Sequence, residues 1–532
     1  MTEVSRNFNN TEKDTLLRKL KGLWKLLFGR TTMFVLLLLI QSFALFGGFA
    51  LLGSKVIAIN YGIGIVSVLI LIYLLNAHSD ANFKLMWIIL IASVPVFGVT
   101  LFLYTRIQPG TATRSNQVER ILEEQRTYLA PARHTIETEL VDARQEYGIF
   151  KYIYEEGHYP SYENASVKYF PLGEAKFAEM LRQLERAEKF IFLEYFIIDK
   201  GEMWDAVLKV LKRKVAQGVE VRLMYDGTCT LSLLPIGFPK EMEALGIRCK
   251  VFSPMRPFLS THQNNRDHRK ILVIDGRVAF TGGVNLADEY INRRERFGHW
   301  KDAAIMVGGR AVDSFTLMFL HMWNIGETRR EDYHRYIIAS DDEVDPGMKR
   351  GGLIAPYGDS PLDLEEVGEK VYLDIINRAE AYVHIMTPYL ILTETMIHSL
   401  IFAAQRGIEV KIILPHIPDK KYAYWLARTY YSELISGGVK IYEYTPGFVH
   451  SKVFASDDRK AVVGTINMDY RSLYLHFECA AYIYNNPVVD DIEKDFQQTL
   501  EMCQRITLQN CRNYSLPARF AGRALRIVAP LM

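Results

Sequence analysis

Cysteine is scarce in this chain, and no CxxC pair occurs. The 532 residues include five scattered cysteines, Cys229, Cys249, Cys479, Cys503 and Cys511. A zinc site needs closely spaced ligands, and a disulfide framework needs an even set of cysteines. The cysteines therefore indicate neither kind of site, and we interpret them as free thiols.

The chain also lacks an excess of charge of either sign. Its 63 Lys and Arg residues nearly cancel its 61 Asp and Glu residues, and 49% of the residues are hydrophobic. A nucleic-acid partner would favour a basic excess, so none is predicted. This composition also excludes a disordered or low-complexity chain, and the length suffices for two or three domains.

Charge is absent from three long stretches near the N-terminus. Residues 31–54, 56–79 and 85–105 contain no Asp, Glu, Lys or Arg, and a bilayer is crossed by ~20 apolar residues. The first stretch is too long, and starts too far into the chain, for a cleaved signal peptide. We predict a membrane domain at residues 32–105 with about three transmembrane helices, in a multi-pass protein of the cell membrane. A re-entrant run, with only two crossings, remains an alternative.

The segments that flank this domain are polar. Residues 1–31 form a basic tail in which Asp14–Gly29 places leucines on one helical stripe, which is typical of an interfacial helix. The basic tail favours a cytoplasmic N-terminus, but the side of the catalytic domain depends on whether two or three helices cross. Residues 106–160, rich in Glu and Arg, predict a helical connector.

An internal repeat follows from about Glu163 onward, where short β-branched runs alternate with amphipathic stretches. Three pairs of segments correspond: Ala187–Ile198 with Ala379–Leu390, Lys214–Tyr225 with Ala403–Leu414, and Leu245–Phe252 with Ser436–Tyr442. The pattern predicts a duplicated α/β domain, with halves at 161–345 and 346–515, whose pseudo-twofold axis brings the two halves into one shared active site. Residues 516–532 are a C-terminal tail that we expect near the membrane.

One motif closes each copy of the repeat, with the spacing H-x-K-x4-D-x6-G-x2-N. The first copy contains His268, Lys270, Asp275, Gly282 and Asn285, and the second contains His450, Lys452, Asp457, Gly464 and Asn467. A lone H-x-K means little, but two full matches 182 residues apart are a specific signal.

This pattern suits phosphodiester chemistry. Residues two apart in a strand face the same side, so each histidine shares a pocket with its lysine. Lys270, Lys452, Asn285 and Asn467 can bind a phosphate, while one histidine attacks phosphorus and the other protonates the leaving oxygen. This chemistry calls for no metal and no cofactor.

Acidic residues have two separate interpretations. Asp302 and Glu478 lie in corresponding segments after the motifs, and we predict that they orient the histidines. Asp275 and Asp457 belong to the motif and are catalytic candidates, but an Asp before a turn residue is also ordinary turn chemistry and could brace the loop.

The motifs and their context resemble the phospholipase D superfamily, and among its members bacterial cardiolipin synthases. The likeness rests on NNRDHRKILVIDGRVAFTGGVNLADEY, GHWKDA, EYTPGFVHSK, NMDYRSLYLHFE and RALRIVAPLM. It implies transfer of a phosphatidyl group between two phosphatidylglycerol molecules, giving cardiolipin and glycerol through a phosphohistidine. In the family the first histidine, here His268, is the nucleophile, and His450 would be the acid and then the base.

Other readings of the sequence remain open. A phospholipase would use the same residues with water as acceptor, and a non-catalytic lipid-binding scaffold would need neither motif intact. Whether phosphatidylethanolamine serves as donor or acceptor, the acyl preference and the oligomeric state are also open. An aromatic and basic stretch, residues 420–431, and the arginines Arg519, Arg523 and Arg526 suit lipid headgroups, but ordinary packing explains them equally.

Overall fold

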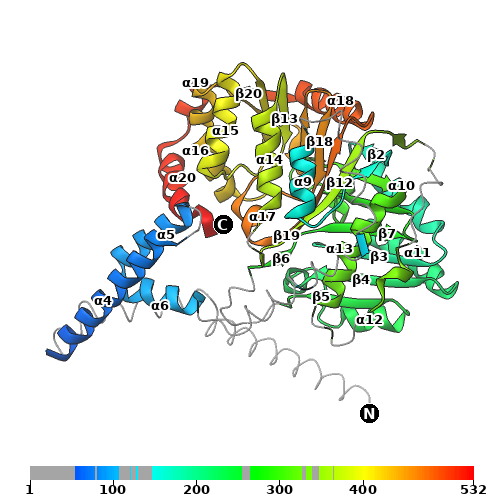
Figure 1. The fold of residues 1–532 in the computed structure, drawn as a ribbon, viewed down its shortest axis with the longest axis horizontal. Coiled ribbons are helices and arrows are strands. Elements are labelled where there is room, and N and C mark those ends of the chain that lie inside the picture. Colours follow the sequence, from blue (N-terminus) through cyan, green and yellow to red (C-terminus); the bar gives the residue numbers. More distant parts are fainter. Residues whose placement is uncertain are drawn as a thin grey trace, which may run out of the picture. The chain divides into compact units, whose positions relative to one another are not determined.

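The computed structural model describes residues 54–77, 81–106, 146–254, 264–325, 331–337, 347–363 and 365–531, together with residues 120, 128–129, 327 and 345. The chain divides into two compact units, residues 1–111 with 255–264 and residues 112–254 with 265–532. Figure 1 shows the elements of each unit. The predicted basic tail, the first charge-free run and most of the predicted connector lie outside the described residues.

Three helices form the described part of the first unit. They are α4 (Ser54–Asn76), α5 (Ala81–Ser93) and α6 (Pro95–Arg106), and each contacts the other two. Ile70, Leu74, Ile91, Val99 and Phe102 are their shared buried core. Among the described residues, no helix has the length and apolar character needed to cross a membrane.

The charge-free run 85–105 forms two helices, whereas the sequence predicted one span. Pro95 begins α6, because proline has no N–H for the preceding turn and fits the first position of a new helix. A Cβ at Gly98 would lie 2.7 Å from the Cα of Ile91. The glycine therefore lets α6 approach the backbone of α5 closely.

The second unit contains two large mixed sheets. The eight-stranded sheet has the order β11 (Lys349–Arg350), β2 (Ser166–Phe170), β10 (Ala304–Gly308), β8 (Val278–Gly282), β7 (Lys270–Ile274), β3 (Phe190–Tyr195), β4 (Glu220–Asp226) and β5 (Arg248–Phe252). The other has the order β1 (Tyr162–Glu163), β12 (Leu353–Asp359), β19 (His476–Tyr484), β18 (Lys460–Gly464), β17 (Val453–Ser456), β13 (Tyr382–Met386), β14 (Glu409–Pro415), β15 (Lys440–Tyr444) and β20 (Cys503–Ile506), with β6 (Arg266–Asp267) beside β19.

The two sheets share one topology. The path β2-β10-β8-β7-β3-β4-β5 matches β12-β19-β18-β17-β13-β14-β15, and in each path only the last three strands are parallel. Strands β7 and β3 lie in the middle of their sheet and are buried along their whole length, as expected for unbroken apolar runs such as ILVI, residues 271–274. The predicted α/β fold with two mixed sheets is confirmed.

Helices flank both sheets in corresponding order. The first half has α10 (Gly173–Glu185), α11 (Glu202–Ala216), α12 (Phe238–Ala244) and α13 (Val312–Asn324), and the second has α14 (Val367–Arg378), α15 (Glu394–Gln405), α16 (Lys421–Ser436), α17 (Tyr470–Tyr474), α18 (Val488–Glu501), α19 (Leu508–Arg512) and α20 (Leu516–Val528). Helix α13 packs on β3, β7 and β8 and also contacts β12, while α18 packs on β13, β15, β17 and β18 and also contacts β2. Each of these two helices thus joins its own sheet to the other sheet (Figure 1).

The halves also exchange their edge strands. Strand β1, at the start of the first half, pairs with β12, and β11, at the start of the second half, pairs with β2. Before β1, helix α9 (Tyr147–Glu155) packs on α14 and β12, with Phe150 against Tyr482 of β19. These exchanges cover sheet edges and tie the halves together, and the predicted boundaries at 161, 346 and 516 stay predictions.

Candidate active site

Two short strand pairs cross between the halves and carry the motif histidines. Strand β6 ends at Asp267 and pairs in parallel with the start of β19. In the same way β16 (Gly447–Val449), which ends just before His450, pairs in parallel with β9 (His299–Lys301). Each histidine therefore leaves its own half and lies beside a strand of the other half.

This crossing places each histidine on an acid from the opposite half. The backbone N–H of His268 donates to the carbonyl of Phe477 at 2.9 Å, and its Nδ1 lies 2.8 Å from Oε1 of the next residue, Glu478. The backbone N–H of His450 donates to the carbonyl of Lys301 at 2.7 Å, and its Nδ1 lies 2.7 Å from Oδ2 of Asp302.

Both acids are thus bonded to histidines, as their positions in the sequence suggested. The crossing itself was not predicted. Each histidine–acid pair contains one residue from each half, so neither histidine has its acid without the other half.

The two acids are accommodated differently. A Cβ at Gly283 would lie 1.9 Å from Oδ1 of Asp302, so this position has room for the carboxylate only because it is glycine. At the corresponding position of the second half, the hydroxyl of Thr465 donates to Glu478. Glycine in the first motif copy thus leaves room for Asp302, whereas threonine in the second copy forms a hydrogen bond to Glu478.

Burial sets the charge states of these pairs. It lowers the pKa of His268 well below the usual value and that of His450 to about 4, although Glu478 and Asp302 oppose the shifts. Burial alone would raise the pKa of the two acids, but the facing imidazoles and the nearby lysines outweigh it, so both carboxyls stay ionised. Each imidazole is then neutral with its Nδ1–H directed to a carboxylate, which leaves a lone pair on Nε2.

The motif lysines are buried next to the histidines. The Nζ of Lys270 donates to the carbonyl of His268, and that of Lys452 donates to the carbonyl of His450. Burial lowers the pKa of Lys270 to about 8 and that of Lys452 to about 7. Lys270 also lowers the pKa of Lys452, and the acids of both halves raise the pKa of both lysines, so these groups share one electrostatic environment.

The two asparagines follow β8 and β18 and are both buried. Oδ1 of Asn285 accepts the backbone N–H of Ile197 at 3.0 Å, and its Nδ2 donates to the hydroxyl of Tyr290 at 2.8 Å. Oδ1 of Asn467 has no hydrogen-bond partner within the described part of the chain. The ring of Tyr290 lies 5.4 Å from that of His450, which places Asn285 close to this histidine.

Asp275 and Asp457 do not contact the histidines through any hydrogen bond in the described residues. Asp275 accepts the backbone N–H groups of residues 188, 189 and 190 at the start of β3. Asp457 does the same for residues 380, 381 and 382 at the start of β13. Both sit at positive φ in the turn after the motif strand, at the opposite end of that strand from the lysine. Their placement fits the bracing interpretation rather than a reacting role.

Sequence reasoning missed two aromatic residues at corresponding positions. Trp300 precedes Asp302 by two residues, and His476 precedes Glu478 by two, so each shares a strand face with its acid. The ring of Trp300 lies 5.4 Å from that of His450, and the ring of His476 lies 5.5 Å from that of His268. Because residues two apart in a strand face the same side, the residues two positions before Asp302 and Glu478 could have been predicted to lie near the histidines.

The same cluster is where a metal ion could bind. Ligand atoms of His268, His476 and Glu478 all lie within 4.8 Å of one another. The Nδ1 of His268 and the carboxylate of Glu478 are however already bonded to each other, so the present geometry is that of a hydrogen-bonded pair, and none of the steps derived below needs an ion.

Comparison with known proteins identifies the family. The family described as "Cardiolipin synthase, PLD-like domain" matches residues 180–323 and 372–500, which include both motifs. The chain belongs to this cardiolipin synthase family. A cardiolipin synthase of Alkalihalophilus pseudofirmus is 31% identical over 90% of the chain and 94% of that protein.

Two further relatives also match most of the chain. A cardiolipin synthase of Geobacillus kaustophilus is 34% identical over 72% of the chain and 76% of its own length. An uncharacterized protein of Streptococcus mutans is 48% identical over 87% of the chain and 99% of its own length. The solved structure of a phosphatidylserine synthase of Haemophilus influenzae superimposes with a TM-score of 0.55 and 14% identity, covering 72% of the chain and all of that structure, which shows a shared fold.

Proposed function

We propose that this protein is a cardiolipin synthase, a phosphatidyltransferase that joins two phosphatidylglycerol molecules into cardiolipin and releases glycerol. The family and its named relatives support phospholipid substrates. The observation that carries the proposal is the crossed arrangement of two histidine–carboxylate pairs with two buried lysines. This is the minimum that a two-step transfer at a phosphodiester needs: a nucleophile, an acid and base, and positive charge.

In the first step Nε2 of His268 attacks the phosphorus of one phosphatidylglycerol. Glu478 holds Nδ1–H and stabilises the positive charge that develops on the ring. His450 is neutral in the free protein, but the negative phosphodiester raises its pKa when it binds beside the ring, and with Asp302 on Nδ1 the ring takes up a proton at Nε2. The P–O bond to the headgroup glycerol then breaks, and His450 gives this proton to the leaving oxygen. Lys270 and Lys452 offset the charge of the phosphoryl oxygens.

In the second step the headgroup hydroxyl of another phosphatidylglycerol is the acceptor. Now neutral, His450 takes the proton of that hydroxyl, the new O–P bond forms, and the bond between phosphorus and Nε2 of His268 breaks. Cardiolipin leaves, and His450 is again protonated for the next cycle. Transfer to this hydroxyl, rather than hydrolysis, requires that the buried site exclude water more strongly than a second lipid headgroup.

We place this reaction at the bacterial cell membrane. Charge-free residues 31–54, 56–79 and 85–105 support a membrane domain, and its substrates are bilayer lipids. In this proposal residues 32–105 hold the enzyme in the membrane as a multi-pass protein.

The test incubates the full-length protein in lipid vesicles with labelled phosphatidylglycerol and resolves the products by mass. Cardiolipin with one glycerol per molecule formed, absent with His268→Ala, is the expected result. Phosphatidic acid without cardiolipin would instead make water the acceptor and the protein a phospholipase. No product with the unaltered chain, under conditions where a relative named as a cardiolipin synthase is active, would overturn the proposal.

A further inference from the structure

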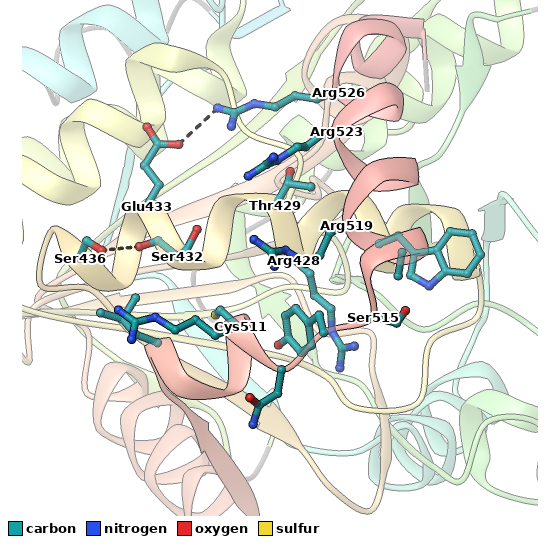
Figure 2. A pocket seen from close by; sticks show the side chains of 16 residues that line it. Arg428, Thr429, Ser432, Glu433, Ser436, Cys511, Ser515, Arg519, Arg523 and Arg526 are labelled. Carbon is teal, nitrogen blue, oxygen red and sulfur yellow. Dashed lines mark hydrogen bonds and ion pairs between the residues drawn. The ribbon is translucent and has the colours of Figure 1, made fainter.

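A second site with phosphate-binding chemistry lies on the outside of the second half. A cavity of about 780 Å³ opens between α16, α19 and α20, and none of its lining residues belongs to the histidine site. Five arginines line it, Arg428, Arg512, Arg519, Arg523 and Arg526, and among the described residues of the lining Glu433 is the single acidic side chain. Figure 2 shows Arg519, Arg523 and Arg526 extending from α20 toward α16.

Part of this positive charge is neutralised by the protein, since Arg428 lies 3.5 Å from Oε1 of Glu443. Arg526 pairs weakly with Glu433 at 3.4 Å and with Glu394 at 3.5 Å. For Arg512, Arg519 and Arg523, by contrast, the described residues provide no ion-pair partner. Repulsion among such close guanidinium groups is relieved when an anion binds between them.

Arg428 also lines the cavity, and two aromatic rings contact its guanidinium. Its guanidinium lies 3.9 Å from the ring centroid of Tyr424 and 4.2 Å from that of Tyr514. Its Nε is buried and has no hydrogen-bond partner among the described residues. A buried donor without a partner costs free energy, so this atom is set up for an acceptor that comes from outside the chain.

The helix α20 places an apolar surface directly beside the arginines. Gly522 packs against α16, where a Cβ would lie 2.6 Å from the carbonyl oxygen of Trp425. At 3.6 residues per turn, the arginine stripe lies next to Gly522, and Leu516, Phe520 and Ile527 form the next stripe outward. These three are exposed, Phe520 to 78%.

We propose that this cavity binds the phosphate of an anionic phospholipid, with the acyl chains along Leu516, Phe520 and Ile527. Guanidinium groups match the oxygens of a phosphodiester, and the neighbouring apolar stripe matches a bilayer surface rather than a dissolved anion. The site binds lipid without chemistry, so it stands apart from the transfer reaction.

The experiment uses the full-length chain carrying His268→Ala, purified in an uncharged detergent, so that binding is read without turnover. Native mass spectrometry follows binding of phosphatidylglycerol, with phosphatidylcholine as the uncharged comparison. The double variant Arg519→Gln/Arg523→Gln should weaken the binding of one phosphatidylglycerol by about tenfold and leave phosphatidylcholine binding as it was. The matched control Arg459→Gln/Arg505→Gln removes two exposed arginines outside the cavity and should change neither.

The other arms separate lipid from small anions. Phe520→Ser should weaken phosphatidylglycerol binding and leave any effect of inorganic phosphate on the melting temperature unchanged. If inorganic phosphate binds through Arg519 and Arg523 while phosphatidylglycerol does not, the lipid assignment is wrong; equal lipid binding by pocket and control variants overturns the site. Because the readout needs no product, its failure is distinct from a failure to make cardiolipin.

Discussion

The lysines of the active site combine full burial with the need to be charged. Burial lowers the pKa of Lys452 to about 7 and that of Lys270 to about 8, so both lose their protons at a lower pH than an exposed lysine. In the proposed reaction the ammonium forms bind the phosphate, and we expect this binding to be lost as the pH rises through these values. Burial also keeps His268 neutral below its usual pKa, so we expect this proposed nucleophile to stay reactive in mildly acid solution.

A pH profile of kcat/KM tests this description, since it reports the groups of the free enzyme. The profile should fall on the alkaline side from about pH 7 to 8, with no matching fall near the usual histidine pKa. Lys452→Arg keeps its charge and should move the alkaline fall to higher pH, even if the rate is lower. An alkaline limb at the same pH in both proteins would show that Lys452 does not cause it.

Gly283 has a defined role that a single methyl group can test. In Gly283→Ala the Cβ would overlap Oδ1 of Asp302 and displace the carboxylate from Nδ1 of His450. Because small misplacements in a catalytic pair are costly, kcat should fall roughly a hundredfold. The control Gly237→Ala adds a methyl group where no atom lies within 4 Å and should retain its rate; equal rates for both variants would contradict the role of Gly283.

At the level of elements, the short strands β6 and β16 decide which acid serves which histidine. The carboxylate of Glu478 fixes His268, although the two belong to different halves. Glu478→Gln should therefore lower kcat by about a thousandfold or more with little change in KM, because it removes the charge that stabilises the attacking imidazole.

A matched variant checks that result. Glu409→Gln removes a carboxylate that pairs with Lys411 and Lys440 in the same half and should leave kcat unchanged. If Glu478→Gln acted mainly on KM, the acid would serve binding rather than the orientation of His268.

Asp275 belongs to another element, the turn that starts β3. Asp275→Ala leaves three backbone N–H groups without an acceptor, and the aspartate is nearly fully buried. We expect a loss of about 2 kcal/mol in stability, read as a lower melting temperature, with the pH profile of the remaining activity unchanged. A changed pH profile at an unchanged melting temperature would mean that Asp275 takes part in the reaction.

How well the sequence predicts a contact in the site depends on how far apart the two residues lie along the chain. The spacing within one motif placed His268 and Lys270 together because only one residue separates them. The predicted shared strand was wrong, since His268 lies between β6 and β7 and only Lys270 belongs to a strand. The crossing of β6 to β19 and of β16 to β9 rests on pairings of only two or three residues between segments far apart in the chain, and no local pattern encodes their register. His476 was missed for a related reason, since its meaning depends on a histidine from the other half.

At the scale of the whole molecule, the repeat predicted two similar sheets because the same strand and helix signals recur in the same order. It did not predict the exchange of β1 and β11 between the sheets, because two-residue edge strands leave no periodic signal. Near the N-terminus, hydropathy alone predicted one helix at residues 85–105. Pro95 was the residue that could have corrected this, because it has no N–H and favours the start of a helix.

The exchanged strands and the crossed histidine–acid pairs join the two halves at one site. The central claim is that His268 is the nucleophile of this site. The most direct measurement quenches the full-length protein in acid-free denaturant during turnover of labelled phosphatidylglycerol and locates the label by peptide mass spectrometry. The account predicts a phosphatidyl group on His268, lost in His268→Ala. Label on His450 instead, or cardiolipin formed while His268 carries none, would contradict it.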